Sequence, residues 1–119
     1  MLKTIGNQEY EFNVKLGTTI KIKKKFNKSF TQVLNDIEKF DVEDLIKLLH
    51  CGLDEEKIKL DEFKENLLEN IGMMELYDLV ECFIKQIQYP GLTEEEIEKK
   101  IIEKNQKAQA MQNMTSLKK

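Results

Sequence analysis

Apolar and polar residues alternate strictly between residues 10 and 16. A period of two places alternate side chains on one face, which predicts a half-buried β-strand. Residues 2–5 supply the first, less well-marked strand, and Gly6 with Asn7 supplies a turn between the two segments. We therefore expect an amino-terminal β-hairpin whose second strand directs four apolar side chains to one face: Tyr10, Phe12, Val14 and Leu16.

The next segment, TTIKIKKKF, fits both periodicities. Ile20 and Ile22 share a face only in a strand. Thr19, Ile22 and Phe26 share a face only in a helix. A short helix capped by the Thr18 side chain is the favoured interpretation, because threonine accepts hydrogen bonds from the free amides of a first helical turn.

From residue 29 onward, apolar residues recur at intervals of three and four, the spacing of an amphipathic helix. Ser29, with Gln32 three residues later, has the pattern of a capping box. Asp41 and Asp61 are placed to cap the next two helices. The expected inner faces are Phe30, Val33, Leu34 and Ile37, then Val42, Leu45, Ile46 and Leu49, then Phe63, Leu67 and Leu68.

The most apolar helix is expected between Gly72 and the single proline, Pro90. Its apolar residues span an arc of about 160° at ~100° per residue, so we expect this helix to lie mostly in the core. A partner-binding role for part of the arc is the less favoured alternative. Thr93 with Glu96 opens a last helix around Ile97. The apolar arc comprises Met73, Leu76, Tyr77, Leu79, Val80, Phe83, Ile84 and Ile87.

Together these elements predict an α+β fold that is mainly α, with an N-terminal β-hairpin followed by about five helices around one core. A chain of 119 residues is long enough for one such core but not for two. We expect residues 1–104 to form a single globular domain. Residues 105–119 should form a loosely ordered C-terminal tail, because they hold too little apolar surface to offset the entropy of ordering.

The tail nevertheless carries apolar residues at every third position, Ala108, Met111, Met114 and Leu117. This spacing is close to that of a helix, and methionine adapts to irregular apolar partners. We hypothesise that these residues bind a hydrophobic helical segment of a partner protein. Deleting residues 105–119 should leave the melting temperature nearly unchanged and should weaken co-purification with that partner. Equal binding by the truncated and full-length proteins would contradict the hypothesis.

Charge is distributed unevenly along the chain. Residues 1–28 contain seven lysines and two acids, residues 29–98 six lysines and nineteen acids, and residues 99–119 six lysines and one acid. All nineteen basic residues are lysines, so the chain lacks arginine, the side chain that binds phosphate in a bidentate manner. The run from Lys21 to Lys28 leaves open an alternative, a small regulatory module that contacts nucleic acid, whose affinity would fall steeply with salt.

The only histidine, His50, is followed by Cys51 and Gly52 at the end of a predicted helix. Adjacent helical side chains diverge by ~100°, so the pair is poorly placed to bind one metal ion or to act as a thiol–imidazole pair. Cys82 completes the supply of soft ligands. We therefore expect a helix end in which Gly52 adopts a left-handed conformation, and two reduced cysteines that are dispensable and bind no metal.

No motif of an enzyme or a cofactor site is present. The chain has no glycine-rich phosphate loop, and its acidic stretch LDEEKIKLDEF lacks the glycine and the ligand alternation of a calcium loop. We expect a non-enzymatic protein without a cofactor; an active site built from ordinary carboxylates and lysines alone would leave no such motif. The absence of an apolar run of about 18 residues and of a signal-peptide pattern favours the cytoplasm.

The order of these features resembles the tail assembly chaperones of long-tailed bacteriophages and related prophages, over about residues 1 to 90. The resemblance rests on the hairpin NQEYEFNVKLG, the charged segment ending in KKF, and DVEDLIKLLHCGL, which is similar to the acidic helix of that family with its leucine-rich Gly-Leu exit. The chain departs from the family pattern at His50 and Cys51, where an aromatic residue and an alanine are more usual.

The resemblance implies a non-enzymatic protein of the bacterial host cytoplasm that is absent from the mature virion. Such a protein binds the tape-measure protein, keeps its long hydrophobic helices soluble and helps bring the tail-tube protein of the same phage to it. A longer, frameshifted product that shares the domain is also common in the family. Neither a small-molecule substrate nor a membrane is expected as a partner.

Overall fold

The structure, a computed structural model, describes residues 1–90, 92–93 and 95–103 of the chain. It confirms the mainly helical α+β class with an amino-terminal hairpin. The proposed tail, residues 105–119 with Ala108, Met111, Met114 and Leu117, lies outside the described residues. The elements are β1 (Leu2–Ile5), β2 (Gln8–Glu11), α1 (Thr18–Phe26), α2 (Phe30–Asp36), the 3₁₀ helix η1 (Ile37–Lys39), α3 (Val42–His50), α4 (Leu60–Asn70) and α5 (Met73–Gln88), and residues 95–103 are also helical.

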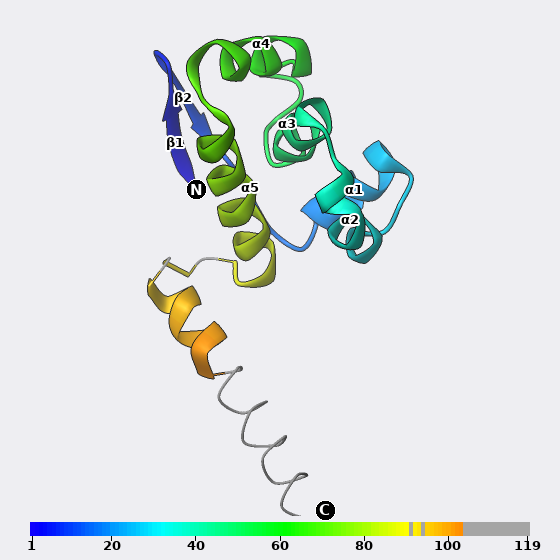
Figure 1. The fold of residues 1–119 in the computed structure, drawn as a ribbon, viewed down its shortest axis with the longest axis vertical. Helices are drawn as coiled ribbons and strands as arrows, with labels where there is room; N and C mark the ends of the chain where they lie inside the picture. Colours follow the sequence, from blue (N-terminus) through cyan, green and yellow to red (C-terminus); the bar gives the residue numbers. More distant parts are fainter. Residues whose placement is uncertain (91, 94, 104–119) are drawn as a thin grey trace, which may run out of the picture.

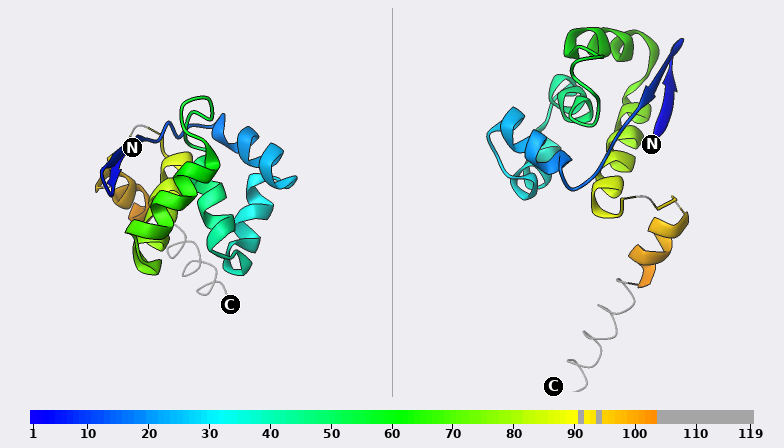
Figure 2. Two further views of the ribbon diagram at one scale, coloured as in Figure 1. Left: turned by 90° about the horizontal axis from the view of Figure 1, so that it is seen from above. Right: turned by 180° about the vertical axis from the view of Figure 1, so that it is seen from behind.

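One hydrophobic core joins the hairpin to helices α1 to α5, and Figure 1 shows how these elements are arranged. The hairpin runs alongside α5, and α4 lies across the upper end of both in Figure 1. Helix α3 lies between α5 and the α1–α2 pair (Figures 1 and 2). None of the described helices combines the length and apolar character that a membrane span requires.

The hairpin has the predicted turn but a shorter second strand than expected. Ile5 pairs with Gln8 across the turn, and Gly6 has a φ of 62°, a left-handed value that suits glycine. The second strand ends at Glu11, although Phe12 and Val14 remain buried. Leu16, which strand alternation assigned to the inner face, is exposed, because the chain has already left the strand when it reaches this residue.

Three predicted caps are confirmed at the start of helices. In the capping box of α2, the Ser29 hydroxyl accepts a hydrogen bond from the Gln32 amide, and the Gln32 side chain accepts one from the Ser29 amide. The Asp41 carboxylate accepts from the Asp44 amide at 2.8 Å and begins α3. At the last helix, the Thr93 hydroxyl accepts from the Glu96 amide at 3.2 Å, as the sequence predicts.

Two other predicted caps are wrong. Thr18 is the first residue of α1, with Gly17 at the cap position, and its hydroxyl accepts from the Lys15 amide and donates to the carbonyl of Asn13 instead. Burial of Thr18 against the preceding loop explains this choice of partners. Asp61 lies within the first turn of α4, where a carboxylate favours the positive end of the helix without capping it.

Gly52 also differs from the prediction. Among the described glycines a positive φ occurs at Gly6 and not at Gly52. Gly52 continues the turn after α3 with its amide bonded to the Leu49 carbonyl, and its carbonyl accepts from the Asn13 amide at 2.8 Å. A Cβ atom at this position would lie 2.7 Å from Cε2 of Phe83. Close approach to the core, and not a left-handed turn, therefore requires glycine here.

The core joins the hairpin to the helices through aromatic rings. Phe63 of α4 makes edge-on contacts with Tyr10 and Phe12 of the hairpin segment, at centroid distances of 5.0 and 6.1 Å. The fully buried apolar side chains from the helices include Ile22, Val33, Ile46, Leu48, Leu49, Phe63, Leu67 and Phe83. Leu68, Met73 and Tyr77, which helical periodicity placed on inner faces, are exposed.

Candidate partner-binding surface

His50 and Cys51 have structural roles. His50 Nε2 lies 2.8 Å from the carbonyl oxygen of Ile58, and because a carbonyl only accepts, Nε2 carries the hydrogen. The buried Nδ1 atom has no hydrogen-bond partner among the described residues. The Cys51 thiol donates to the Lys47 carbonyl at 3.5 Å, and burial raises its pKa to about 11. Within the described part of the chain, no three His, Cys, Asp or Glu side chains are grouped to hold a metal ion.

The raised pKa of Cys51 predicts an unreactive thiol. At pH 8 a group with a pKa near 11 is almost entirely protonated, and the thiolate is the form that reacts. When the native protein is treated with a thiol-specific reagent at pH 8, the half-buried Cys82 should therefore be modified first. Cys51 should be modified only when the protein unfolds. Rapid modification of both cysteines before denaturant is added would contradict this assignment.

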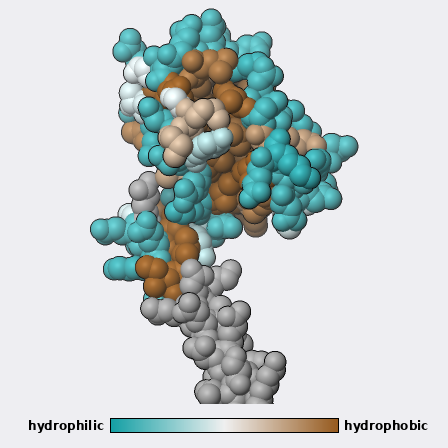
Figure 3. All heavy atoms as spheres, viewed as in Figure 1, coloured by the Kyte–Doolittle hydropathy of each residue, from teal (hydrophilic) through white to brown (hydrophobic). Residues whose placement is uncertain are grey.

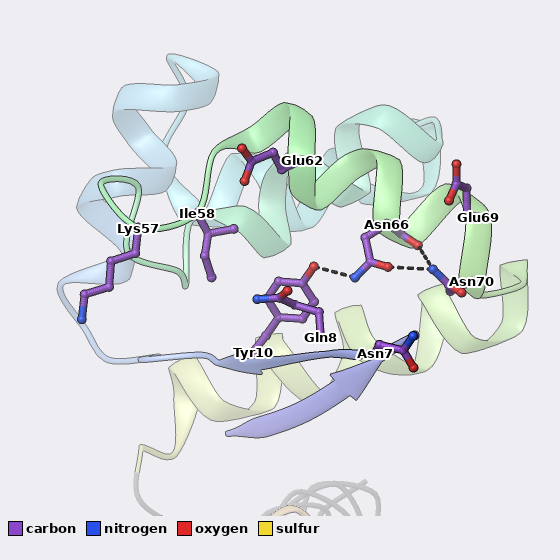
Figure 4. A pocket seen from close by; sticks show the side chains of 10 residues that line it. Asn7, Gln8, Tyr10, Lys57, Ile58, Glu62, Asn66, Glu69 and Asn70 are labelled. Carbon is purple, nitrogen blue, oxygen red and sulfur yellow. Dashed lines mark hydrogen bonds between the residues drawn. The ribbon is translucent and has the colours of Figure 1, made fainter.

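A polar pocket of about 500 Å³ lies between the tip of the hairpin and α4 (Figure 4). The Asn66 amide donates to the Tyr10 hydroxyl at 2.6 Å and to the Ile5 carbonyl at 3.1 Å. The Asn70 amide donates in turn to the Asn66 side-chain oxygen. The hydrogen bonds of these amides therefore fix α4 to the hairpin. Lys57 and Glu62 line the pocket on the side away from Asn70 (Figure 4). The arrangement supports the fold.

Acidic residues face the lysine-rich segment from Lys21 to Lys28. Lys25 lies 3.5 Å from Glu55, and Lys28 lies 3.0 Å from Asp36. The aromatic ring of this segment, Phe26, stacks on Phe40 and is not presented for stacking with a nucleic-acid base. These contacts make the surface mixed in charge and do not favour a phosphate-binding role.

An apolar groove of about 290 Å³ opens where α3, α4 and α5 meet. The two residues from α3 form one wall, two from α4 form the second, and the start of α5 forms the third. None of its lining residues is charged. We define the apolar groove by these residues: Val42, Ile46, Leu67, Leu68, Ile71, Gly72, Met73 and Leu76.

Exposed apolar side chains extend the groove along α5. Leu68 and Met73 within it, and Met74 and Tyr77 beside it on the first turns of α5, are all exposed; Leu68 is 56% exposed and Met74 71%. Apolar atoms gather between α5 and α3 and continue towards α4, with polar residues on both sides (Figure 3). A contiguous apolar surface with a polar border is typical of a site that binds another protein.

The carboxylates that neighbour groove residues in the sequence do not line the groove. Glu43 pairs with Lys64 at 2.9 Å. Glu69 lines the polar pocket beside the hairpin, and Glu75 lines a cleft between β1 and α5. The groove is therefore an uncharged apolar surface, which fits the apolar stripe of an amphipathic helix.

The sequence signal for this surface was the width of the apolar arc of α5. Helical periodicity identifies the arc but not which part of it other elements cover. The partner-binding residues predicted from the sequence, at positions 108 to 117, lie outside the described residues, so the structure adds a second surface and does not test the first. Comparisons with protein-family models, with curated proteins and with solved structures found no match for this chain.

Proposed function

We propose that this protein is a non-enzymatic tail assembly chaperone of a phage or prophage, and that it binds helical segments of the tape-measure protein. The apolar groove is the observation that carries this proposal. Its lining is apolar on all three walls, and Leu68 and Met73 remain exposed to contact a partner.

A helix is the occupant that the groove fits best. Apolar side chains at positions i, i+3, i+4 and i+7 of a helix form a continuous stripe, and such a stripe binds in a groove between helices. Burying the stripe removes apolar surface from water, which both favours binding and prevents that surface from aggregating. A chaperone would act in this way on a long hydrophobic helix, by covering its apolar stripe until the helix is assembled.

The groove would select a partner by apolar contact, because none of its lining residues is charged. The resemblance in the hairpin and in DVEDLIKLLHCGL supports a tape-measure segment as this helix. Delivery of the tail-tube protein would follow from this capture, since the chaperone would hold the tape-measure protein soluble while tube subunits assemble on it.

The proposal is tested in phage particles. A phage that carries Leu68→Glu with Met73→Glu in this gene should produce heads without normal tails in electron micrographs, because two carboxylates would occupy the apolar groove. The control is Leu16→Glu with Ile20→Glu, which adds the same charge at exposed apolar positions outside the groove. Normal tails in the groove variant, with the variant protein present at its usual level, would refute the proposal.

A further inference from the structure

The hydrogen-bond register of the hairpin determines which backbone groups face outward. Met1 and Phe12 exchange two hydrogen bonds, N–H to carbonyl in each direction, at 3.0 and 2.8 Å. Bonded and non-bonded pairs alternate along an antiparallel ladder. The pairs Leu2 with Glu11 and Thr4 with Glu9 are therefore non-bonded pairs. The backbone N–H and carbonyl groups of Leu2 and Thr4 point away from β2, towards the open edge of β1.

A trough runs beside this open edge, between β1 and α5. Two neighbouring clefts of about 250 and 370 Å³ form it. Lys3 of β1 and Asp78 and Cys82 of α5 line both clefts, which makes them continuous. No residue of β2 lines either cleft among the described residues, so the trough lies on the β1 side of the hairpin. The hairpin and α5 run side by side in both views of Figure 2.

The trough has an apolar end and an acidic wall. Ile5, Ile71 and Leu79 line the first cleft. Glu75 and Asp78 stand on α5 beside them, both exposed. Further along α5, Glu81 is paired with Lys85 at 3.0 Å. A segment lying in the trough would thus have the open edge of β1 on one side. On the other side it would meet apolar side chains and the carboxylates of α5.

We propose that the open edge of β1 binds an extended, basic segment of a partner polypeptide as a third strand of the sheet. The outward groups of Leu2 and Thr4 supply main-chain hydrogen bonds, as in strand addition generally. Side chains of the added strand point alternately to its two faces. Those on the face that Lys3 and Ile5 share are directed towards α5, where lysines or arginines meet Glu75 and Asp78. This site would bind an extended strand, whereas the apolar groove would bind a helix. The proposal for the edge of β1 does not depend on the chaperone proposal.

A second copy of this chain is a poorer occupant than a basic segment. In the antiparallel register that uses Leu2 and Thr4 of both copies, each Lys3 lies directly opposite the other Lys3. Like charges in that position are destabilising, and an edge lysine is a common means of preventing self-association through a strand. The acidic wall of α5 instead selects a strand that brings positive charge.

The probe for this site is a capped peptide of about nine residues in which valine alternates with lysine. In its presence, the amide hydrogens of Leu2 and Thr4 in the full chain should exchange at least about tenfold more slowly, because they become bonded. A matched peptide with glutamate in place of lysine should bind at least about tenfold more weakly, because it would face the carboxylates of α5. Unchanged exchange at Leu2 and Thr4, or equal affinity for the two peptides, would overturn the proposal.

A pair of proline variants locates the contact. Thr4→Pro removes an outward N–H and obstructs the edge of β1 without removing a bond to β2, so it should weaken the lysine peptide at least about tenfold. Its cross-strand neighbour supplies the control, because Glu9→Pro makes the same change at the opposite edge and should change affinity less than about twofold. Equal effects of the two prolines would overturn the proposal. If Thr4→Pro does not fold, the exchange measurement on the unmodified chain decides whether the edge of β1 is bound.

Discussion

Replacing Phe83 with alanine is expected to lower the free energy of unfolding by about 3–5 kcal/mol. Phe83 is completely buried near the middle of α5 and contacts the tight exit of α3 at Gly52. The substitution removes the transfer free energy of the ring and leaves a cavity that the surrounding helices fill only in part. Chemical denaturation followed by far-ultraviolet circular dichroism measures the change, which is a large share of the stability of a small domain.

Met74→Ala is the matched control for this prediction, because Met74 lies on the same helix and is exposed. Surface substitutions of this kind change stability by about 0.5 kcal/mol or less. An unchanged denaturation midpoint for Phe83→Ala would show that α5 does not pack on the core in the way described.

Replacing Gly52 with alanine is expected to cost about 1–3 kcal/mol, although alanine is usually the more favourable residue. The added Cβ would lie 2.7 Å from Cε2 of Phe83, closer than carbon atoms approach without displacement. The Phe83 ring is buried and has little room to move, so the strain is shared by α5 and the loop after α3. The same denaturation measurement detects the loss.

Gly17→Ala is the control for the Gly52 substitution. A Cβ at Gly17 would meet nothing within 4 Å, and its φ of −59° is favourable for alanine. This variant should be as stable as the parent protein or slightly more stable. In addition, Gly52→Ala should cost less in a Phe83→Leu background, where the clashing ring is absent, and a strictly additive double variant would contradict the contact.

Local features of the fold were predictable from the sequence because they depend on residues close together in the chain. The capping box of Ser29 and Gln32 and the cap at Asp41 need only the backbone amides of the next turn. The hairpin needs only Gly6 and the flanking strands. These features follow from short-range chemistry, and the structure has the two caps and the hairpin turn at the predicted positions.

Features set by distant contacts were not predictable in the same way. Gly52 requires glycine because of Phe83, which lies 31 positions along the chain. Thr18 bonds to the preceding loop and not to its own helix because the loop is held against the core. Such features depend on tertiary packing, which helical periodicity and capping patterns in the sequence do not predict.

The candidate surface shows the same division. Periodicity predicts an apolar face on α5 that includes Met73 and Tyr77, but it does not show that α3 and α4 leave these two residues exposed. The exposed end of the apolar arc and the groove beside it arise from the way three helices meet. Which part of an apolar face binds a partner is thus a property of the packed domain.

The claim that the apolar groove captures an amphipathic helix is tested most directly by nuclear magnetic resonance of methyl groups. A helical fragment of the tape-measure protein would be titrated into protein labelled at its methionine, leucine and isoleucine methyls. We expect the largest shifts at Leu68, Met73 and Leu76, and we expect Leu68→Glu with Met73→Glu to abolish them. Shifts confined to other surfaces, such as the exposed Leu16 and Ile20, or unchanged binding by the groove variant, would contradict the claim.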